Sequence, residues 1–178
     1  MKLIETKIKG AFVLLDEFKE DSRGGFCKLY NEEIFKSNNL DFHPKEVYYN
    51  CSNKNVIRGM HFQSPPYDHK KLIKCISGKI LDVILDIRKE SPTYLKYDII
   101  TLNENDGKSI FLPKGIAHGF LSLENNTLVL YNVSTVYNSN YDKGISWNSF
   151  GFEWPSNNPI LSNRDKDFPH INEFKSPF

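Results

Sequence analysis

The feature that most constrains this chain is a run of short apolar segments, rich in β-branched and aromatic residues, between Glu46 and Val136. Clusters such as Asn53-Lys54-Asn55 and Ser77-Gly78 separate them, and such clusters mark turns. The segments expected as strands are Val47–Ser52, Val56–Phe62, Leu72–Ile76, Lys79–Ile87, Tyr97–Leu102, Ser109–Leu112, His118–Ser122 and Thr127–Val136. Short strands at this spacing are typical of a β-sandwich or jelly roll and not of alternating βαβ units.

The two ends of the chain carry weaker signals. Residues 1–14 alternate well enough for one or two strands, residues 17–25 are polar and turn-rich, and Phe26–Tyr30 is expected as a short strand. Asn31 is a candidate N-cap for a short helix that continues to Phe35. The last stretch contains Pro155, Pro159, Pro169 and Pro177. We expect it to wrap irregularly over the sheet, with one helical turn near Arg164–Asp167.

Length, charge and cysteine content narrow the class of protein. The chain of 178 residues is expected to form a single domain, residues 1–178, of all-β class with short flanking helices. Its net charge of +1 argues against nucleic acid as a partner. No apolar run is long enough to span a bilayer, which argues against a membrane protein. The cysteines, Cys27, Cys51 and Cys75, are odd in number and scattered, so we expect free thiols and a cytoplasmic location.

The segment Lys79–Arg88 has an unusual alternation. Leu81, Val83, Leu85 and Ile87 would share one face of a strand, whereas Asp82, Asp86 and Arg88 would lie with two isoleucines on the other. The charged side chains either face solvent or line a polar cavity inside a barrel, and the sequence leaves both possibilities open.

Two histidines stand in distinctive segments. His61 follows Arg58 in Val-Ile-Arg-Gly-Met-His-Phe-Gln, and His118 follows a Pro/Gly turn in Leu-Pro-Lys-Gly-Ile-Ala-His-Gly-Phe. A single histidine is more often a surface or core residue than a functional one.

Taken together, many segments in register resemble the dTDP-4-dehydrorhamnose 3,5-epimerase family from about residue 4 to residue 168. The matching runs are Asp21-Ser22-Arg23-Gly24 with Phe26, Val56–Gln63, Lys71-Leu72-Ile73, Ser77-Gly78, Leu81-Asp82-Val83, Asp86-Ile87-Arg88, Ser91–Tyr94, Leu112–Phe120, Leu130-Tyr131, Tyr137, Gly144-Ile145, Trp147-Asn148, Glu153-Trp154-Pro155 and Leu161–Asp165. The resemblance implies a cupin-type jelly roll (a double-stranded β-helix). It also implies a homodimer that acts without a cofactor on a nucleotide-diphosphate sugar, a 4-keto-6-deoxy sugar, at C3, C5 or both.

Such an epimerisation needs a base, an acid on the opposite face of the sugar and a cation beside the developing enolate oxygen. By the resemblance, His61 is the base and Asp165 holds its tautomer, Tyr131 is the acid and Lys71 is the cation. From the residues alone, Tyr131 could equally be a packed strand aromatic, and Asp165 could cap a turn. If Lys71 is the cation, its neighbour Lys70 is expected to be solvated.

The resemblance also implies a substrate-binding set. Its members are Arg23, Phe26, Lys28, Asn50, Arg58, Gln63, Asp82, His118 and Tyr137. Arg23 and Phe26 match positions that hold the nucleotide diphosphate, reaching across a dimer interface. Lys28 stands where the family usually has Glu, and a cation cannot accept the hydrogen bonds that a carboxylate accepts. Beside the default substrate, dTDP-4-keto-6-deoxyglucose, a GDP-linked 4-keto heptose of capsule synthesis therefore stays an alternative.

Two other function classes compete with an epimerase. A metal-dependent cupin enzyme needs two neighbouring histidines, a carboxylate and a further histidine, but His61 is followed by Phe62-Gln63 and no metal site is expected. A jelly roll that only binds a sugar nucleotide is the second alternative. It has no need of a base and an acid on opposite faces, which argues against it.

Overall fold

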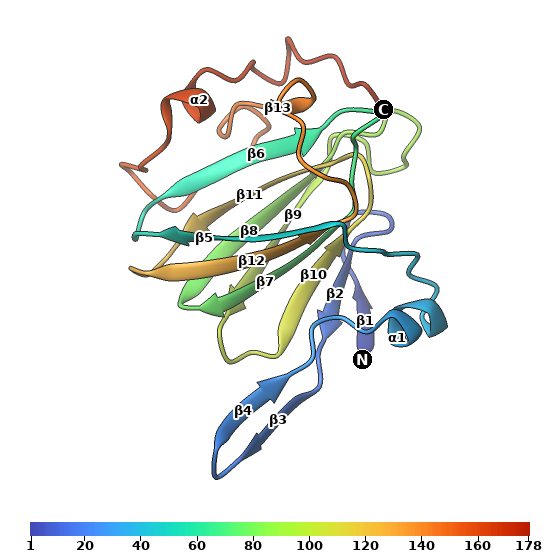
Figure 1. The fold of residues 1–178 in the computed structure, drawn as a ribbon. Helices are drawn as coiled ribbons and strands as arrows, with labels where there is room; N and C mark the ends of the chain where they lie inside the picture. Colours follow the sequence, from blue (N-terminus) through green and yellow to red (C-terminus); the bar gives the residue numbers. More distant parts are fainter.

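The computed structural model describes all 178 residues, and nearly all of its regular structure is β (Figure 1). Two antiparallel sheets face each other. One has the strand order β1-β2-β10-β7-β12-β5 and the other β13-β6-β11-β8-β9. The strands of the first are β1 (Lys2–Glu5), β2 (Phe12–Leu15), β10 (Lys108–Leu112), β7 (Lys71–Ser77), β12 (Thr127–Val133) and β5 (Glu46–Ser52). Those of the second are β13 (Asp142–Gly144), β6 (Ile57–Gln63), β11 (Ile116–Ser122), β8 (Lys79–Asp86) and β9 (Tyr97–Asn103).

The main core lies between the inner faces of the two sheets. Ile73 and Val129 of the six-stranded sheet belong to one buried cluster with Ile80, Ile84 and Phe120 of the five-stranded sheet. Strand alternation explains this, because every second side chain of each strand points to the same face. The expected strands between residues 46 and 133 are confirmed, with ends shifted by a few residues.

The outer faces of both sheets are covered by the ends of the chain. The C-terminal segment wraps over the five-stranded sheet, where Trp154 joins a second buried cluster (Figure 1). Helix α1 (Glu32–Ser37) places Phe35 in a third cluster against the six-stranded sheet. As expected, Asn31 caps α1, since its side chain accepts a hydrogen bond from the N–H of Ile34 at 3.1 Å. Neither α1 nor α2 (Asn163–Lys166) is long and apolar enough to cross a membrane.

Strand β8 buries both of its faces. Asp82 lies inside the barrel with no exposed surface, where His118 contacts it. Asp86 is also fully buried, and the Arg88 guanidinium donates to its carboxylate at 2.7 and 2.8 Å. Of the two possibilities for these charges, solvent exposure is therefore wrong. Asp86 tolerates burial because hydrogen bonds replace the lost water, whereas in Asp82 only Oδ2 has a partner and Oδ1 is buried without one.

The segment before α1 differs from expectation. Instead of a polar loop followed by a strand over Phe26–Tyr30, the chain forms a hairpin of β3 (Phe18–Asp21) and β4 (Gly24–Cys27). The turn places Asp21 opposite Gly24, and the Asp21 carboxylate accepts from the backbone N–H of Arg23 at 2.9 Å. Figure 1 shows that this hairpin projects away from the two main sheets. Its polar residues gave no apolar periodicity from which the strands could be predicted.

Strands β6 and β11 approach each other unusually closely at two glycines. A Cβ atom on Gly59 would lie 2.6 Å from the Cα of Gly119, and Gly59 has a φ of +150°. Only glycine fits such an approach without displacing the backbone. At this contact the pairing shifts in register between His118 and Phe120, and His61 lies directly opposite His118.

Candidate active site

A cavity of about 270 Å³ opens between the two sheets on the side where β5 and β6 face each other. Its lining residues are Glu46, Tyr48, His61, Phe62, Gln63, His69, Lys71, Val133, Thr135, Tyr137, Asp142 and Arg164. Four of the residues predicted from the sequence, His61, Gln63, Lys71 and Tyr137, thus share one cavity.

His61 is held by a carboxylate from the far end of the chain. Its Nε2 lies 2.9 Å from Oδ1 of Asp165, 104 residues later in the sequence. Asp165 is buried in α2, where its N–H is capped by Ser162 at 3.1 Å, and its Oδ2 accepts from the N–H of Gly59 at 3.2 Å. The ring of Phe168 meets the His61 ring edge-on at 5.6 Å. The helical turn expected near residue 164 therefore forms, and it serves to place Asp165.

The electrostatics of this pair suit a base. Burial by itself would raise the pKa of Asp165, but hydrogen bonds from His61 and Gly59 hold that pKa below its ordinary value. An ionised carboxylate can only accept, so the proton of a neutral His61 ring sits on Nε2. The lone pair of Nδ1 is then the one that can take up a proton.

Lys71 reaches the same region from the opposite sheet. Its Nζ donates to the backbone oxygen of His61 at 3.1 Å, and its side chain is almost completely buried. Burial lowers the pKa of Lys71 from 10.5 to about 8, although Asp142 and Asp82 oppose that change. The ammonium is thus a poorly solvated cation, which interacts strongly with any negative charge that forms beside it. Lys70, which was expected to be solvated, is only partly exposed and pairs with the exposed Asp41 at 2.6 Å.

A second histidine–aspartate pair lies deeper in the barrel. His118 Nε2 and Asp82 Oδ2 are 2.7 Å apart, and both side chains are buried. Burial lowers the pKa of His118 while Asp82 opposes the shift. The edge of the His118 ring meets Tyr131 with 5.8 Å between ring centroids. His118 stands opposite His61 in register, so it links the surroundings of His61 to Tyr131 on the other sheet.

Tyr131 is packed against a tyrosine that the sequence analysis did not single out. Tyr48 lies directly opposite Tyr131 in the pairing of β5 with β12, and their rings stack with centroids 4.9 Å apart and planes 11° apart. Burial, together with Tyr48 and Asp82, raises the pKa of Tyr131 well above its ordinary value. A signal for Tyr48 existed, because strand alternation puts it on the same face as Asn50.

Arg58 and Asn50, two further residues predicted from the sequence, lie near Tyr131. A third, Gln63, holds the loop that contains Asn138. Arg58 donates to the Ser52 hydroxyl at 3.0 Å and to the backbone oxygen of Cys51 at 3.1 Å. The Oδ1 of Asn50 is buried without a partner. Gln63 accepts from the N–H of Asn138 at 2.7 Å and donates to nearby backbone oxygens.

Asp142, Arg164 and His69 also line the cavity, although no pattern in the sequence indicated them. Asp142 forms an ion pair with Arg164 at 2.7 Å. Burial lowers the pKa of His69 to about 3, which keeps this ring neutral. Asp142 and Arg164 lie far apart in the sequence, and no local pattern connects them. The chain brings together no group of three or more His, Cys, Asp or Glu side chains that could hold a metal ion.

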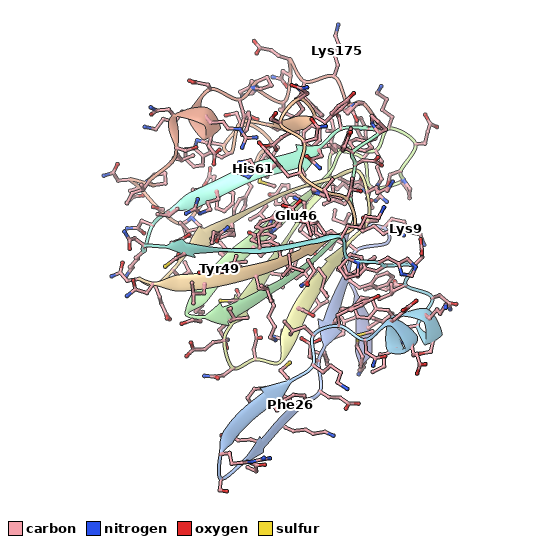
Figure 2. All side chains as sticks on the ribbon, in the orientation of Figure 1. Lys9, Phe26, Glu46, Tyr49, His61 and Lys175 are labelled. Atoms are coloured by element: carbon pink, nitrogen blue, oxygen red, sulfur yellow. The ribbon has the colours of Figure 1, made fainter.

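The structure does not bring the expected nucleotide-binding residues to this cavity. Arg23, Phe26 and Lys28 lie in or just after the β3–β4 hairpin, and Figure 2 shows Phe26 far from His61. Phe26 is 61% exposed, and the Arg23 guanidinium pairs with Asp21 at 2.6 Å. Within one chain none of these three residues lines the cavity that contains His61.

Comparison with known proteins gives a consistent result. A family model described as dTDP-4-dehydrorhamnose 3,5-epimerase matches residues 5–173. The dTDP-4-dehydrorhamnose 3,5-epimerase of Methanothermobacter thermautotrophicus is 34% identical over 177 residues, which cover 97% of this chain and 95% of that protein.

Solved structures agree with the sequence relatives. A crystal structure of dTDP-4-dehydrorhamnose 3,5-epimerase from Bacillus anthracis, with TDP and PPi bound, is 35% identical with a TM-score of 0.92, over 96% of this chain and 99% of that one. An epimerase from Legionella pneumophila in complex with dTDP-4-keto-L-rhamnose is 25% identical with a TM-score of 0.91, over 98% and 94%. The fold is thus a cupin-type jelly roll. These relatives give no support to a GDP-linked heptose, a metal-dependent cupin or a non-catalytic binder.

Proposed function

The chain belongs to the dTDP-4-dehydrorhamnose 3,5-epimerase family and is an isomerase of nucleotide sugars, and on that premise we propose that it inverts C3 and C5 of dTDP-4-keto-6-deoxyglucose. The observation that carries the proposal is the bond from His61 to Asp165 in a cavity that also contains Lys71, with Tyr131 on the opposite sheet. This is the set of groups that proton removal beside a ketone requires.

The proposed reaction moves one proton off and one proton on at each carbon. The Nδ1 lone pair of His61 takes the proton from the carbon beside the ketone, and the bonding electrons move to the keto oxygen as an enolate. Asp165 stabilises the imidazolium that results. The enolate then collapses and takes a proton on its opposite face from the Tyr131 hydroxyl. His61 and Tyr131 return to their starting states by exchange with water.

Lys71 supplies the stabilisation of the enolate oxygen in this proposal. It donates to a single backbone oxygen and has no carboxylate partner within ion-pair distance, so its remaining N–H groups are free for a ligand. A preorganised cation in a poorly solvated site stabilises developing negative charge far more than the same cation in water.

We propose further that two copies of the chain form a homodimer, in which the β3–β4 hairpin of one copy reaches the nucleotide bound by the other. Two features support this. Phe26 and Arg23 are exposed and do not line the cavity of their own chain, and Figure 2 shows Phe26 far from His61. On the edge strand β5, Val47 is 58% and Tyr49 67% exposed. An aromatic ring and a guanidinium suit a base and a diphosphate. Light scattering would measure the assembly, and Phe26→Ala is expected to weaken dTDP binding.

The test of the proposed function is incubation with dTDP-4-keto-6-deoxyglucose in deuterated water, with deuterium located by NMR. Wild type should incorporate deuterium at C3 and C5 and give the inverted sugar. His61→Asn should abolish incorporation at both carbons. Tyr131→Phe removes only the hydroxyl, so product should fall much more than proton loss does. Normal exchange in His61→Asn would place the base elsewhere, and equal retention of both activities in Tyr131→Phe would reduce that residue to packing.

A further inference from the structure

Tyr48 lies between the cavity and the residue proposed as the acid. Tyr48 lines the cavity with His61 and is 40% exposed, whereas Tyr131 is 5% exposed and is not among the lining residues. The two rings are nearly parallel and in contact. A substrate that reaches His61 therefore meets Tyr48 first, and Tyr131 is approached along the stacked ring.

The Tyr131 ring is held from two directions. Tyr48 covers one face, and the edge-on contact with His118 holds it from another side. His118 is itself fixed by its 2.7 Å bond to Asp82. These two contacts limit how far the Tyr131 ring can move, and so they restrict the position of its hydroxyl. Stacked aromatic pairs of this kind contribute about 0.5–1.5 kcal/mol beyond the area that they bury.

The aim of that hydroxyl matters because the enolate has two possible fates. The proton can return from His61 to the original face, which regenerates the substrate, or a new proton can arrive from Tyr131 on the opposite face, which gives inversion. The ratio of these two outcomes depends on how well the acid is placed, and a displacement of 1 Å can cost roughly 100-fold in such a transfer.

We propose that Tyr48 is the positioning residue of the acid side, and that its ring, stacked on Tyr131, sets the share of enolates that are protonated on the inverted face. The inference rests on the proposed function. It assigns Tyr48 a role through its ring and not through its own hydroxyl.

The experiment measures a ratio, namely deuterium in recovered, uninverted substrate divided by deuterium in inverted product. Tyr48→Leu removes the stack and should raise this ratio by roughly 10-fold or more. Tyr48→Met is the second variant, in case the first folds poorly. Tyr48→Phe keeps the ring and should stay within about threefold of wild type. General damage to the fold would slow both outcomes together, and damage to the base side would slow the return of the proton from His61 and lower the ratio, so neither would raise it.

A matched control is Tyr97→Leu. Tyr97 is a partly buried tyrosine in contact with Phe150 and Phe152 on the far side of the five-stranded sheet, remote from the cavity. The Tyr97→Leu variant should lose a comparable amount of aromatic packing but keep the wild-type deuterium ratio. The proposal is overturned if Tyr48→Leu and Tyr48→Met keep the wild-type ratio. It is also overturned if Tyr48→Phe changes the ratio as much as they do, since the hydroxyl would then be the active group.

A second readout separates this inference from the proposed function. If wild type incorporates no deuterium at all, the proposed function fails, and Tyr48 can still be judged from the mobility of Tyr131. NMR of labelled tyrosine should show slow ring flips for Tyr131 in wild type and fast flips in Tyr48→Leu. Equal flip rates in the two proteins would show that Tyr48 does not hold Tyr131.

Discussion

Lys71 should make the protein less stable at neutral pH, because a buried ammonium is held there without a carboxylate partner. Its side chain is 5% exposed and its only hydrogen bond goes to the backbone oxygen of His61. Burial lowers the pKa from 10.5 to about 8, with Asp142 and Asp82 opposing. At about 1.4 kcal/mol for each pH unit, that difference in pKa lowers the free energy of unfolding by about 3 kcal/mol at pH values below 8.

The perturbation is Lys71→Met, which keeps the length of the side chain and removes the charge. Removing the buried charge should stabilise the fold by about 3 kcal/mol at pH 7, and the lost hydrogen bond should offset about 1 kcal/mol of this. We therefore expect the variant to be about 2 kcal/mol more stable than wild type at pH 7 and to lose deuterium exchange.

The sign of the pH dependence follows from linkage. The folded-state pKa of Lys71 lies below the unfolded one, so between pH 8 and 10.5 the unfolded state binds more protons, and wild-type stability gains from rising pH. Lys71→Met lacks this gain. Its advantage should therefore shrink by about 2 kcal/mol between pH 7 and pH 9.5.

The assay is urea unfolding of both proteins at these two pH values, with the difference between them as the observable, since other titrating groups then cancel. A Lys71→Met variant that is less stable than wild type at pH 7 would show that the buried ammonium does not destabilise the fold. A stability difference that does not change with pH would contradict the prediction as well, because the ammonium would then be adequately solvated.

Four further predictions concern other parts of the molecule. Asp165→Asn should lower the exchange rate roughly 100-fold or more in kinetic assays while the fold is kept, because the amide can donate to Nε2 and so favour the tautomer in which Nδ1 carries the proton. Gly59→Ala should destabilise the protein by more than about 2 kcal/mol in urea unfolding, since its Cβ would clash with Gly119. Lys28→Glu should change the ratio of GDP to dTDP binding roughly tenfold in titrations, and an unchanged ratio would place base recognition elsewhere. Treatment with a chelator should leave the epimerisation rate unchanged, and activity that a metal restores would contradict this.

Most of the local structure could be predicted from the amino-acid sequence. Spacing of apolar segments and turn residues predicted the strands between residues 46 and 133, because each strand is encoded by its own alternation. Asn31 predicted the start of α1, since capping is a local hydrogen bond. The motifs around His61 and His118, read together with the resemblance, also led to residues that the fold brings around the cavity.

Contacts between residues far apart in the chain depend on how the sheets assemble. Pairing of β5 with β12 places Tyr48 on Tyr131, and the path of the C-terminal segment carries Asp165 back to His61. Neither contact leaves a local trace, because strand register depends on pairing partners and close backbone approaches elsewhere in the barrel. The same holds for Asp82. Its burial was decided by the six-stranded sheet, which packs against that face of β8 and clusters Ile73 and Val129 with Ile80 and Ile84.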